Sequence, residues 1–256
     1  MKQTLMALVV VLGLAGSAQA GPLLVAGEIN NGAFQFCASD NNVGCGNGLQ
    51  LLDTNPLVGV LSLDPVNLLG LLIEGSFQQA AIGSQNLLSS SSLTITNTTG
   101  STIQTSTSVG NLGYPGPGTL GSSTGSGTWV NAIGSNALYS FFLDGANNQG
   151  GESPLDRPGT LVCQFSDLAN LSVDSFSQNC GPYGIATGNQ YSMTLGFDMT
   201  LIGGGQLISR GQSEIANQVP VPEPASLVLL GSGLVGAFAK MRRKRATAVT
   251  APSLTA

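Results

Sequence analysis

The longest alternating run in the chain is QYSMTLGFDMTL, residues 190–201. Every odd-numbered residue from Tyr191 to Leu201 is apolar, whereas the residues between them are small or polar. Successive side chains of a β-strand point to opposite faces of a sheet, so this pattern predicts a strand with one face in a hydrophobic core. Gly203-Gly204-Gly205 then predicts a hairpin turn, after which residues 206–209 return as the next strand.

Shorter segments of the same kind recur along the chain. Leu93-Thr94-Ile95-Thr96, the turn Asn97-Thr98-Thr99-Gly100 and residues 102–105 predict a second hairpin with β-branched residues on both arms. Residues 68–77 are apolar enough for a buried strand or a short helix, and their periodicity does not decide between the two. Further strands are expected at residues 23–29, 33–37, 57–63 (bounded by Pro56 and Pro65), 128–130, 137–143, 161–165 and 171–176.

Two stretches are rich in residues that favour turns. Residues 110–127, which include Tyr114-Pro115-Gly116-Pro117-Gly118, predict a long surface loop, and residues 144–159 predict a second, polar loop. Many short strands without an amphipathic helix predict an all-β fold, an antiparallel β-sandwich that is jelly-roll-like. We expect a single domain over residues 21–217, because no charged or proline-rich linker divides that range.

The chain is acidic and sparsely charged. It contains 13 Asp and Glu, 8 Lys and Arg, and no His. Residues 21–219 hold 12 acidic residues against 2 basic ones, Arg157 and Arg210, which gives a net charge of −10. Such a surface repels nucleic acid, so we expect neither DNA nor RNA as a partner.

The first 20 residues have the pattern of a signal peptide. Lys2 supplies a positive start, and residues 5–16 are almost wholly apolar but too short to span a membrane. Ala18 and Ala20 form the Ala-x-Ala pattern that a signal peptidase cleaves, which predicts a mature chain beginning at Gly21. The alternative, an uncleaved N-terminal anchor, is disfavoured by the short apolar run.

Four cysteines are present in a chain that we expect to be exported, and an even number in that setting predicts disulfide bonds. Three pairings are possible, of which the local one closes short loops. A zinc site is the competing interpretation, but the spacings form no CxxC pair. The residues concerned are Cys37, Cys45, Cys163 and Cys180.

Two acidic turns offer oxygen ligands of the kind that Ca²⁺ binds. One is residues 144–152 with Asp156, and the weaker one is Asp40 with Asn41, Asn42 and Asn47. Neither has EF-hand spacing, and ordinary turns are favoured. An aromatic platform for sugars is a further hypothesis, although packing in the core is favoured for its members, Trp129, Tyr139, Phe141 and Phe142.

Catalytic patterns are not recognisable. A Ser-His-Asp triad cannot be built without His, no pair of acids forms a hydrolase motif, and Gly125-Ser126-Gly127 lacks the context of a nucleophile. We therefore predict a protein that is not an enzyme and uses no cofactor or metal. Asn97-Thr98-Thr99 and Asn170-Leu171-Ser172 fit the acceptor pattern for N-glycosylation.

The end of the chain combines three features in order. Residues 218–224 form a proline-rich linker that contains Pro222, Glu223 and Pro224. Residues 225–240 predict a membrane-spanning helix, whose apolar part, residues 225–239, would be about 22 Å long against a bilayer core of about 30 Å. The positive-inside rule places residues 241–256 in the cytoplasm because of the basic cluster Arg242, Arg243, Lys244 and Arg245.

This order of features resembles the PEP-CTERM sorting domain of Gram-negative bacteria, the substrate signal of exosortases. The resemblance covers residues 219–245 only, and the chain departs from it by continuing to Ala256. It implies export, transient insertion in the inner membrane, cleavage at or near Pro-Glu-Pro by an exosortase, and delivery to the cell surface or extracellular matrix.

We therefore expect an exported surface or matrix protein with a structural or interaction role. Its expected partners are signal peptidase, an exosortase and the inner membrane, and an exopolysaccharide is a further candidate. A Ca²⁺- or carbohydrate-binding adhesin module is the alternative. The sequence does not name a ligand for the folded part.

Overall fold

The computed structural model describes residues 21–46, 48–82 and 84–216. They lie in the first of two compact units of the chain, Met1–Asn217 and Gln218–Ala256. The predicted signal peptide (1–20), the proline-rich linker (218–224), the predicted membrane helix (225–240) and the basic tail (241–256) lie outside the described residues.

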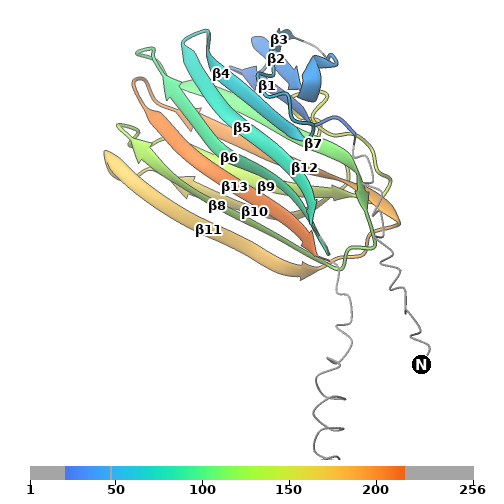
Figure 1. Cartoon of the computed structure of the whole chain (residues 1–256). Coiled ribbons are helices and arrows are strands. Elements are labelled where there is room, and N and C mark those ends of the chain that lie inside the picture. Colours follow the sequence, from blue (N-terminus) through green and yellow to red (C-terminus); the bar gives the residue numbers. More distant parts are fainter. Residues whose placement is uncertain (1–20, 47, 83, 217–256) are drawn as a thin grey trace, which may run out of the picture. The chain divides into compact units, whose positions relative to one another are not determined.

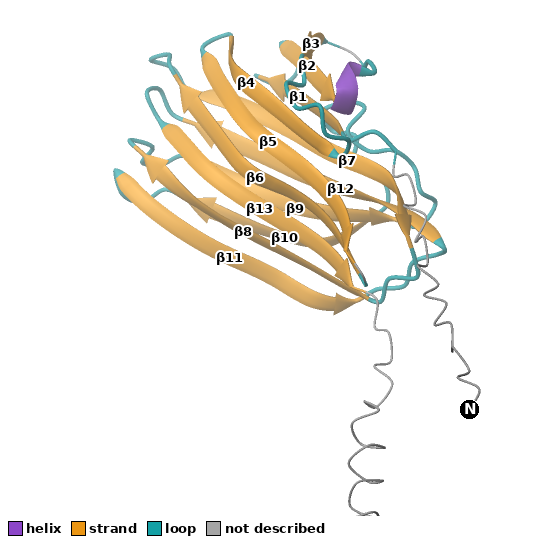
Figure 2. Cartoon of the chain, in the orientation of Figure 1, coloured by secondary structure: helices purple, strands orange, loops and turns teal. Residues whose placement is uncertain are grey.

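The described residues form two β-sheets packed face to face (Figures 1 and 2). The seven-stranded sheet has the order β10 (Thr160–Leu168), β9 (Asn136–Asp144), β12 (Gln190–Leu201), β7 (Ile103–Pro115), β1 (Leu24–Ile29), β2 (Phe34–Ser39), β3 (Leu49–Leu51). The six-stranded sheet has the order β11 (Val173–Gly184), β8 (Leu120–Val130), β13 (Gln206–Ala216), β6 (Gln85–Asn97), β5 (Leu71–Ile82), β4 (Val60–Leu68). One short 3-10 turn, η1 (Asp40–Asn42), follows β2. The predicted all-β sandwich is confirmed.

Eight of the strands form a rolled-up hairpin. One arm runs from β6 to β9 and the other from β10 to β13, and β6 pairs with β13, β7 with β12, β8 with β11, and β9 with β10, all antiparallel. The arms cross between the two sheets as they run, which is the jelly-roll arrangement. Strands β5 and β4 extend one sheet, while β1, β2 and β3 extend the other. Among the strand pairs that the structure describes, β2 and β3 alone run parallel.

Two predicted hairpins are wrong, although their strands exist. Strands β6 and β7 lie in different sheets, and so do β12 and β13, so the turns after Asn97 and Leu201 are corners that cross the sandwich. The buried Asn97 side-chain amide donates hydrogen bonds to the carbonyl oxygens of Ser101, Leu201 and Ile202, which ties the two corners together. Alternation of apolar residues is the same in a hairpin and in such a corner, so the sequence pattern could not separate them.

The predicted loop over residues 110–127 is also wrong. Strand β7 continues to Pro115, β8 begins at Leu120, and only residues 116–119 connect them. Two glycines of β8 leave room for aromatic rings to pack against the strand. A Cβ atom at Gly125 would lie 2.6 Å from the ring of Phe165, and one at Gly127 would lie 2.7 Å from the ring of Phe176. Glycine in a strand often marks such a close approach.

Other segments follow the sequence more closely. Residues 68–77 fall in β4 and β5, not in a helix, and β4 passes through Pro65 with a register shift between Leu63 and Val66. Because β4 is an edge strand, a proline there removes no hydrogen bond that a neighbour needs. The predicted strand at 171–176 begins later, at Val173, and runs on to Gly184.

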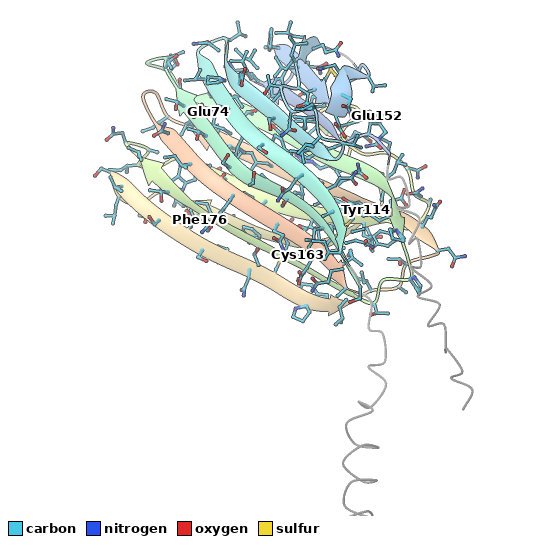
Figure 3. The ribbon with its side chains drawn as sticks, in the orientation of Figure 1. Glu74, Tyr114, Glu152, Cys163 and Phe176 are labelled. Atoms are coloured by element: carbon cyan, nitrogen blue, oxygen red, sulfur yellow. A yellow bond between two sulfur atoms is a disulfide. The ribbon has the colours of Figure 1, made fainter. Side chains whose placement is uncertain are left out.

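The core lies between the sheets. The odd-numbered residues of β12 face it as predicted, and its largest fully buried side chains include Trp129, Tyr114, Tyr191, Phe36 and Phe141. Figure 3 shows Tyr114 and Phe176 among these core side chains. The rings of Tyr114 and Tyr191 stack with centroids 5.8 Å apart.

Candidate functional site

The predicted processing residues lie outside the described part of the chain. This holds for Ala18 and Ala20, for Pro222, Glu223 and Pro224, and for the basic cluster Arg242, Arg243, Lys244 and Arg245. Among the described residues, none of the helices is long and apolar enough to cross a membrane.

The last described strand, β13, remains in the sheet up to its final residue. Ala216 is in register with Gln85 of β6 on one side and Leu120 of β8 on the other, and its carbonyl oxygen accepts a hydrogen bond from the Thr119 N–H. At the start of the described chain, the Gly21 N–H donates to the carbonyl oxygen of Leu112 in β7. The β7–β8 connection, residues 116–119, lies between these contacts, so Gly21 and Ala216 lie at the same end of the sandwich.

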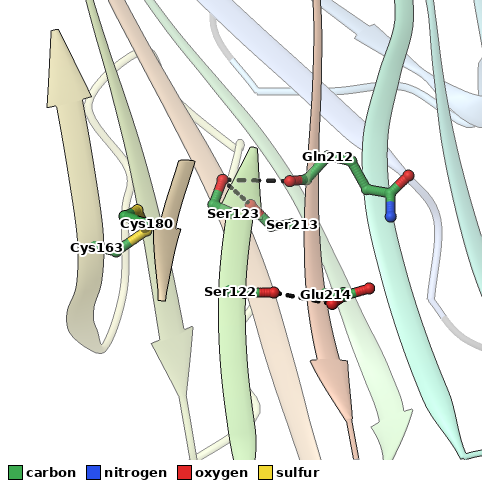
Figure 4. The surroundings of a disulfide bond; sticks show 7 residues. All are labelled: Ser122, Ser123, Cys163, Cys180, Gln212, Ser213 and Glu214. Atoms are coloured by element: carbon green, nitrogen blue, oxygen red, sulfur yellow. Dashed lines mark hydrogen bonds between the residues drawn. A yellow bond between two sulfur atoms is a disulfide. The ribbon is translucent and has the colours of Figure 1, made fainter. Parts of the chain in front are cut away.

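The four cysteines form the local pairing. Cys37 of β2 bonds to Cys45 in the segment leading to β3, and Cys163 of β10 bonds to Cys180 of β11. Strands β10 and β11 are edge strands of opposite sheets, so the second disulfide joins the two layers at one side of the sandwich (Figure 4). No free cysteine remains to support a zinc site.

The first acidic turn is held by its own hydrogen bonds. The Asp144 carboxylate accepts from the backbone N–H groups of Ala146 and Asn148 and from the Asn148 side chain. Burial alone would raise the pKa of Asp144, but these hydrogen bonds hold it below its usual value. No group of three or more His, Cys, Asp or Glu suited to a metal occurs in the described residues, so the geometry favours the plain turn.

The β9–β10 loop, residues 145–159, lies against the outer face of the seven-stranded sheet. Arg157 donates two hydrogen bonds to the Asp198 carboxylate of β12, at 2.7 and 2.6 Å, and further ones to Ser108 Oγ and the Thr107 carbonyl oxygen of β7. A Cβ atom at Gly110 would overlap the carbonyl oxygen of Gly150. The polar face of β12 is therefore partly covered, which the sequence did not indicate.

The second acidic turn is a local structural cluster. Asp40 is buried and accepts hydrogen bonds from the Gly59 N–H and the Asn41 side chain, while Asp53 accepts from the backbone N–H groups of Asn41, Asn55 and Ser62. Desolvation, with the Asp53 charge nearby, raises the pKa of Asp40. These carboxylates thus fix the chain between β2 and β4.

The four aromatic residues considered as a sugar platform do not form one exposed surface, and packing in the core, which the sequence favoured, holds for Trp129, Tyr139 and Phe141, whereas Phe142 is half-buried. Trp129 and Phe141 are fully buried, and the indole N–H of Trp129 donates to Asp167. Tyr139 stacks on Phe165 with centroids 5.0 Å apart, and burial raises its pKa. These rings pack in the core. The two glycosylation acceptors also differ: Asn97 is buried at the corner described above, whereas Asn170 is exposed.

An unpredicted feature is a groove on the outer face of the six-stranded sheet, which we call the outer groove. It consists of two adjoining depressions of about 370 and 420 Å³ that share Ser91, Ser126 and Arg210. It crosses five neighbouring strands, and its lining includes Gln78, Ser91, Gln212, Arg210, Ser126 and Ser177. Alternation places these residues on one face, but only the strand order brings them together.

The outer groove differs in charge from the rest of the domain. Asp and Glu are absent from the described residues that line it, and Arg210 is its one cation. The Arg210 Nε–H donates to Ser126 Oγ at 3.3 Å, and the residue is exposed. On the same face of β13, the nearest described carboxylate is that of Glu214. It does not pair with Arg210 but accepts a hydrogen bond from Ser122 Oγ (Figure 4).

Comparison with known families identifies the end of the chain. Residues 220–244 match the family described as the PEP-CTERM protein-sorting motif. The match contains Pro222, Glu223 and Pro224 and ends within the basic cluster, at Lys244. The molecule is thus a jelly-roll β-sandwich followed by a sorting motif, and the chain is a PEP-CTERM motif-containing protein.

No curated protein matches the sequence. Matches among solved structures include TmCBM61 in complex with β-1,4-galactotriose, at 7% identity and a TM-score of 0.32 over 59% of this chain and 91% of that one. The C-terminal family 22 carbohydrate-binding module of Clostridium thermocellum Xyn10B matches at 14% identity and a TM-score of 0.30, over 55% and 87% of the two chains. The family 11 carbohydrate-binding module of Clostridium thermocellum Lic26A-Cel5E matches at 10% identity and a TM-score of 0.25, over 65% and 94%.

Proposed function

We propose that this protein is exported by its signal peptide, held in the inner membrane by residues 225–240, and cleaved by an exosortase at or near Pro222-Glu223-Pro224. The β-sandwich is then delivered to the cell surface or extracellular matrix. The match of residues 220–244 to the sorting motif is the observation that carries this proposal. The signal-peptide pattern of residues 1–20 supports it, because the two signals act in one export route.

The sequence also supports a division of roles within the tail. Glu223 between two prolines offers an extended substrate, since proline disfavours helix and interior strand. The apolar segment holds that substrate at the membrane, and the cations that follow fix its orientation.

The end of β13 supports processing without damage to the fold. Ala216 is paired with strands on both sides, and the five residues 217–221 separate it from Pro222. A protease that acts on extended chain would therefore meet its substrate beyond the last paired residue. The sandwich released by such a cut keeps all of the described strands.

The folded part has a structural or interaction role in this proposal, without catalysis. The absence of His from the sequence supports this. So do the acidic turns around Asp144 and Asp40, whose carboxylates are used by hydrogen bonds within the fold.

A direct test replaces Glu223 by Ala in the full chain and follows cell fractionation and electrophoretic mobility. We expect the variant to accumulate in the inner membrane as the unprocessed form, while Gln218→Ala, a matched change outside the Pro-Glu-Pro, behaves as wild type. Identical distribution and migration of the Glu223→Ala variant and the wild type would show that the sorting proposal is wrong.

A further inference from the structure

We propose that the outer groove binds an acidic polysaccharide, with Arg210 pairing with a carboxylate of the polymer and the surrounding Ser, Thr and Gln side chains bonding to its hydroxyl groups. Sorting concerns only where the sandwich is delivered. Binding in the outer groove is a contact that the sandwich makes after delivery.

The lining of the groove suits sugar hydroxyls. Serine and threonine hydroxyls and glutamine amides both donate and accept hydrogen bonds, as sugar hydroxyls do. Ser91, Ser126, Ser177, Gln78 and Gln212 come one each from the five neighbouring strands that the groove crosses, and β13 also supplies Arg210. At about 4.8 Å between strands, four intervals span about 19 Å, which suits a polymer segment better than a single small molecule.

The charge of the groove favours a polysaccharide that carries acidic groups over a neutral one. Residues 21–219 carry 12 acidic and 2 basic residues, yet the described lining of the groove contains Arg210 and no carboxylate. The other cation, Arg157, is paired with Asp198 on the opposite sheet. Arg210 is thus the cation that the sandwich offers to a ligand, and it lies where both depressions meet.

Arg210 has hydrogen-bond donors to offer to such a carboxylate. Its guanidinium carries five N–H donors, of which one is used by Ser126 Oγ within the described residues. A planar guanidinium binds a carboxylate through two parallel hydrogen bonds, a geometry that lysine does not provide.

Other occupants fit less well. The overall charge disfavours nucleic acid. A protein partner would use several apolar or aromatic anchors at its centre, whereas the large apolar side chains in the described lining are the buried Phe176 and a single exposed one, Ile208. The hydroxyl-rich lining with one cation favours the polysaccharide.

The test uses the full chain in detergent, with Arg242, Arg243, Lys244 and Arg245 replaced by Gln in every sample so that the basic tail does not hold the polymer. Retardation is measured by affinity electrophoresis in gels containing polygalacturonate, alginate, hyaluronate, carboxyl-reduced polygalacturonate or dextran. Arg210→Gln removes the cation. Gln164→Glu makes the same change in net charge at an exposed position on the other sheet and serves as the matched control.

We expect at least one acidic polymer to retard the protein, and carboxyl reduction to abolish retardation by polygalacturonate if that polymer binds. Arg210→Gln should weaken the apparent affinity about tenfold, Gln212→Ala about threefold, and Gln164→Glu not at all. All variants should unfold at the wild-type temperature, because the changed side chains are exposed.

Three outcomes would overturn the proposal: no retardation by any acidic polymer, equal retardation of wild type and Arg210→Gln, or equal binding of the carboxyl-reduced polymer. If the wild type is a dimer in the absence of polymer and Arg210→Gln is a monomer, the groove binds a second copy of the chain and the proposal is wrong. Fractionation of Arg210→Gln separates this inference from sorting, since the variant should be processed as wild type whether or not the groove binds.

Discussion

Arg157 of the β9–β10 loop forms a bidentate ion pair with Asp198 of β12, in which the side chains are 11% and 31% exposed. The same guanidinium bonds to Ser108 Oγ and the Thr107 carbonyl oxygen of β7. One side chain therefore connects the loop to two neighbouring strands of the seven-stranded sheet.

Replacing Arg157 by Ala should lower the free energy of unfolding by about 2–3 kcal/mol, because it leaves Asp198 and its neighbours without their shared donor. Urea unfolding followed by tryptophan fluorescence measures this, since Trp129 is buried in the core. Arg210→Ala removes an exposed arginine with one hydrogen bond and should cost less than about 0.5 kcal/mol. Equal losses for the two variants would contradict an anchoring role for Arg157.

A methyl group at Gly110 should displace the β9–β10 loop, because the added Cβ atom would meet the carbonyl oxygen of Gly150. We expect Gly110→Ala to lower stability by about 1–3 kcal/mol and to expose residues 145–159 to limited proteolysis. Gly145→Ala is the matched control within the same loop, since a Cβ atom there would have no neighbour within 4 Å. Unchanged proteolysis of Gly110→Ala would show that the loop does not rest on β7.

Asp144 should contribute acid-sensitive stability. Burial alone would raise its folded pKa, but the hydrogen bonds from Ala146 and Asn148 outweigh desolvation and hold that pKa below its usual value. Its contribution is therefore present above about pH 4 and is lost as the pH falls through the folded pKa. Asp144→Asn should cost about 1–2 kcal/mol at pH 7, and the difference from wild type should shrink below pH 4. Asp40, whose pKa is raised, acts in the opposite sense.

Comparing wild type and Asp144→Asn at each pH isolates Asp144 from Asp40, which is present in both. Chemical unfolding between pH 2.5 and 7 is the measurement. A difference that stays constant over this range would contradict a lowered pKa for Asp144.

Removing the Cys163–Cys180 bond should destabilise the sandwich by about 2–3 kcal/mol, since it closes a loop with a sequence separation of 17. Cys163→Ala with Cys180→Ala tests this by thermal and urea unfolding. Peptide mapping without reduction should recover the pairs Cys37–Cys45 and Cys163–Cys180 from the wild type. Recovery of a long-range pair such as Cys37–Cys180 would contradict the fold, because β2 and β11 lie far apart in different sheets.

The sequence predicted where most strands lie because a half-buried strand alternates with period two, as residues 190–201 do. It did not predict which strands pair. The turns after Asn97 and Leu201 looked like hairpins because alternation says nothing about whether the chain re-enters the same sheet or crosses to the other one.

The glycines of residues 110–127 predicted a loop, whereas most of these residues lie in strands β7 and β8. Gly125 and Gly127 lie in β8, where the rings of Phe165 and Phe176 occupy the space that a side chain at these two positions would fill. Those rings come from β10 and β11, and they lie 40 and 49 residues further along the chain than the glycines that they contact. A local composition cannot report a distant partner.

The sorting motif and the folded surfaces differ in how far the sequence reveals them. Pro222, Glu223, Pro224 and the cations that follow are contiguous, so their order alone identifies the motif. Arg157 and Arg210 were visible as the two basic residues of an acidic domain, but their different roles depend on strands that are far apart in sequence. The groove around Arg210 exists only once β5, β6, β13, β8 and β11 are aligned.

Gly21 and Ala216, the first and last described residues, lie at the same end of the sandwich. Because the fold already brings these two residues to one end, a covalent link between them would not strain the native arrangement. A short peptide joining them should permit circular permutation, with new ends opened in the turn around Ile133, whose side chain is 55% exposed. The pairing of the described strands should therefore not depend on where the chain is opened.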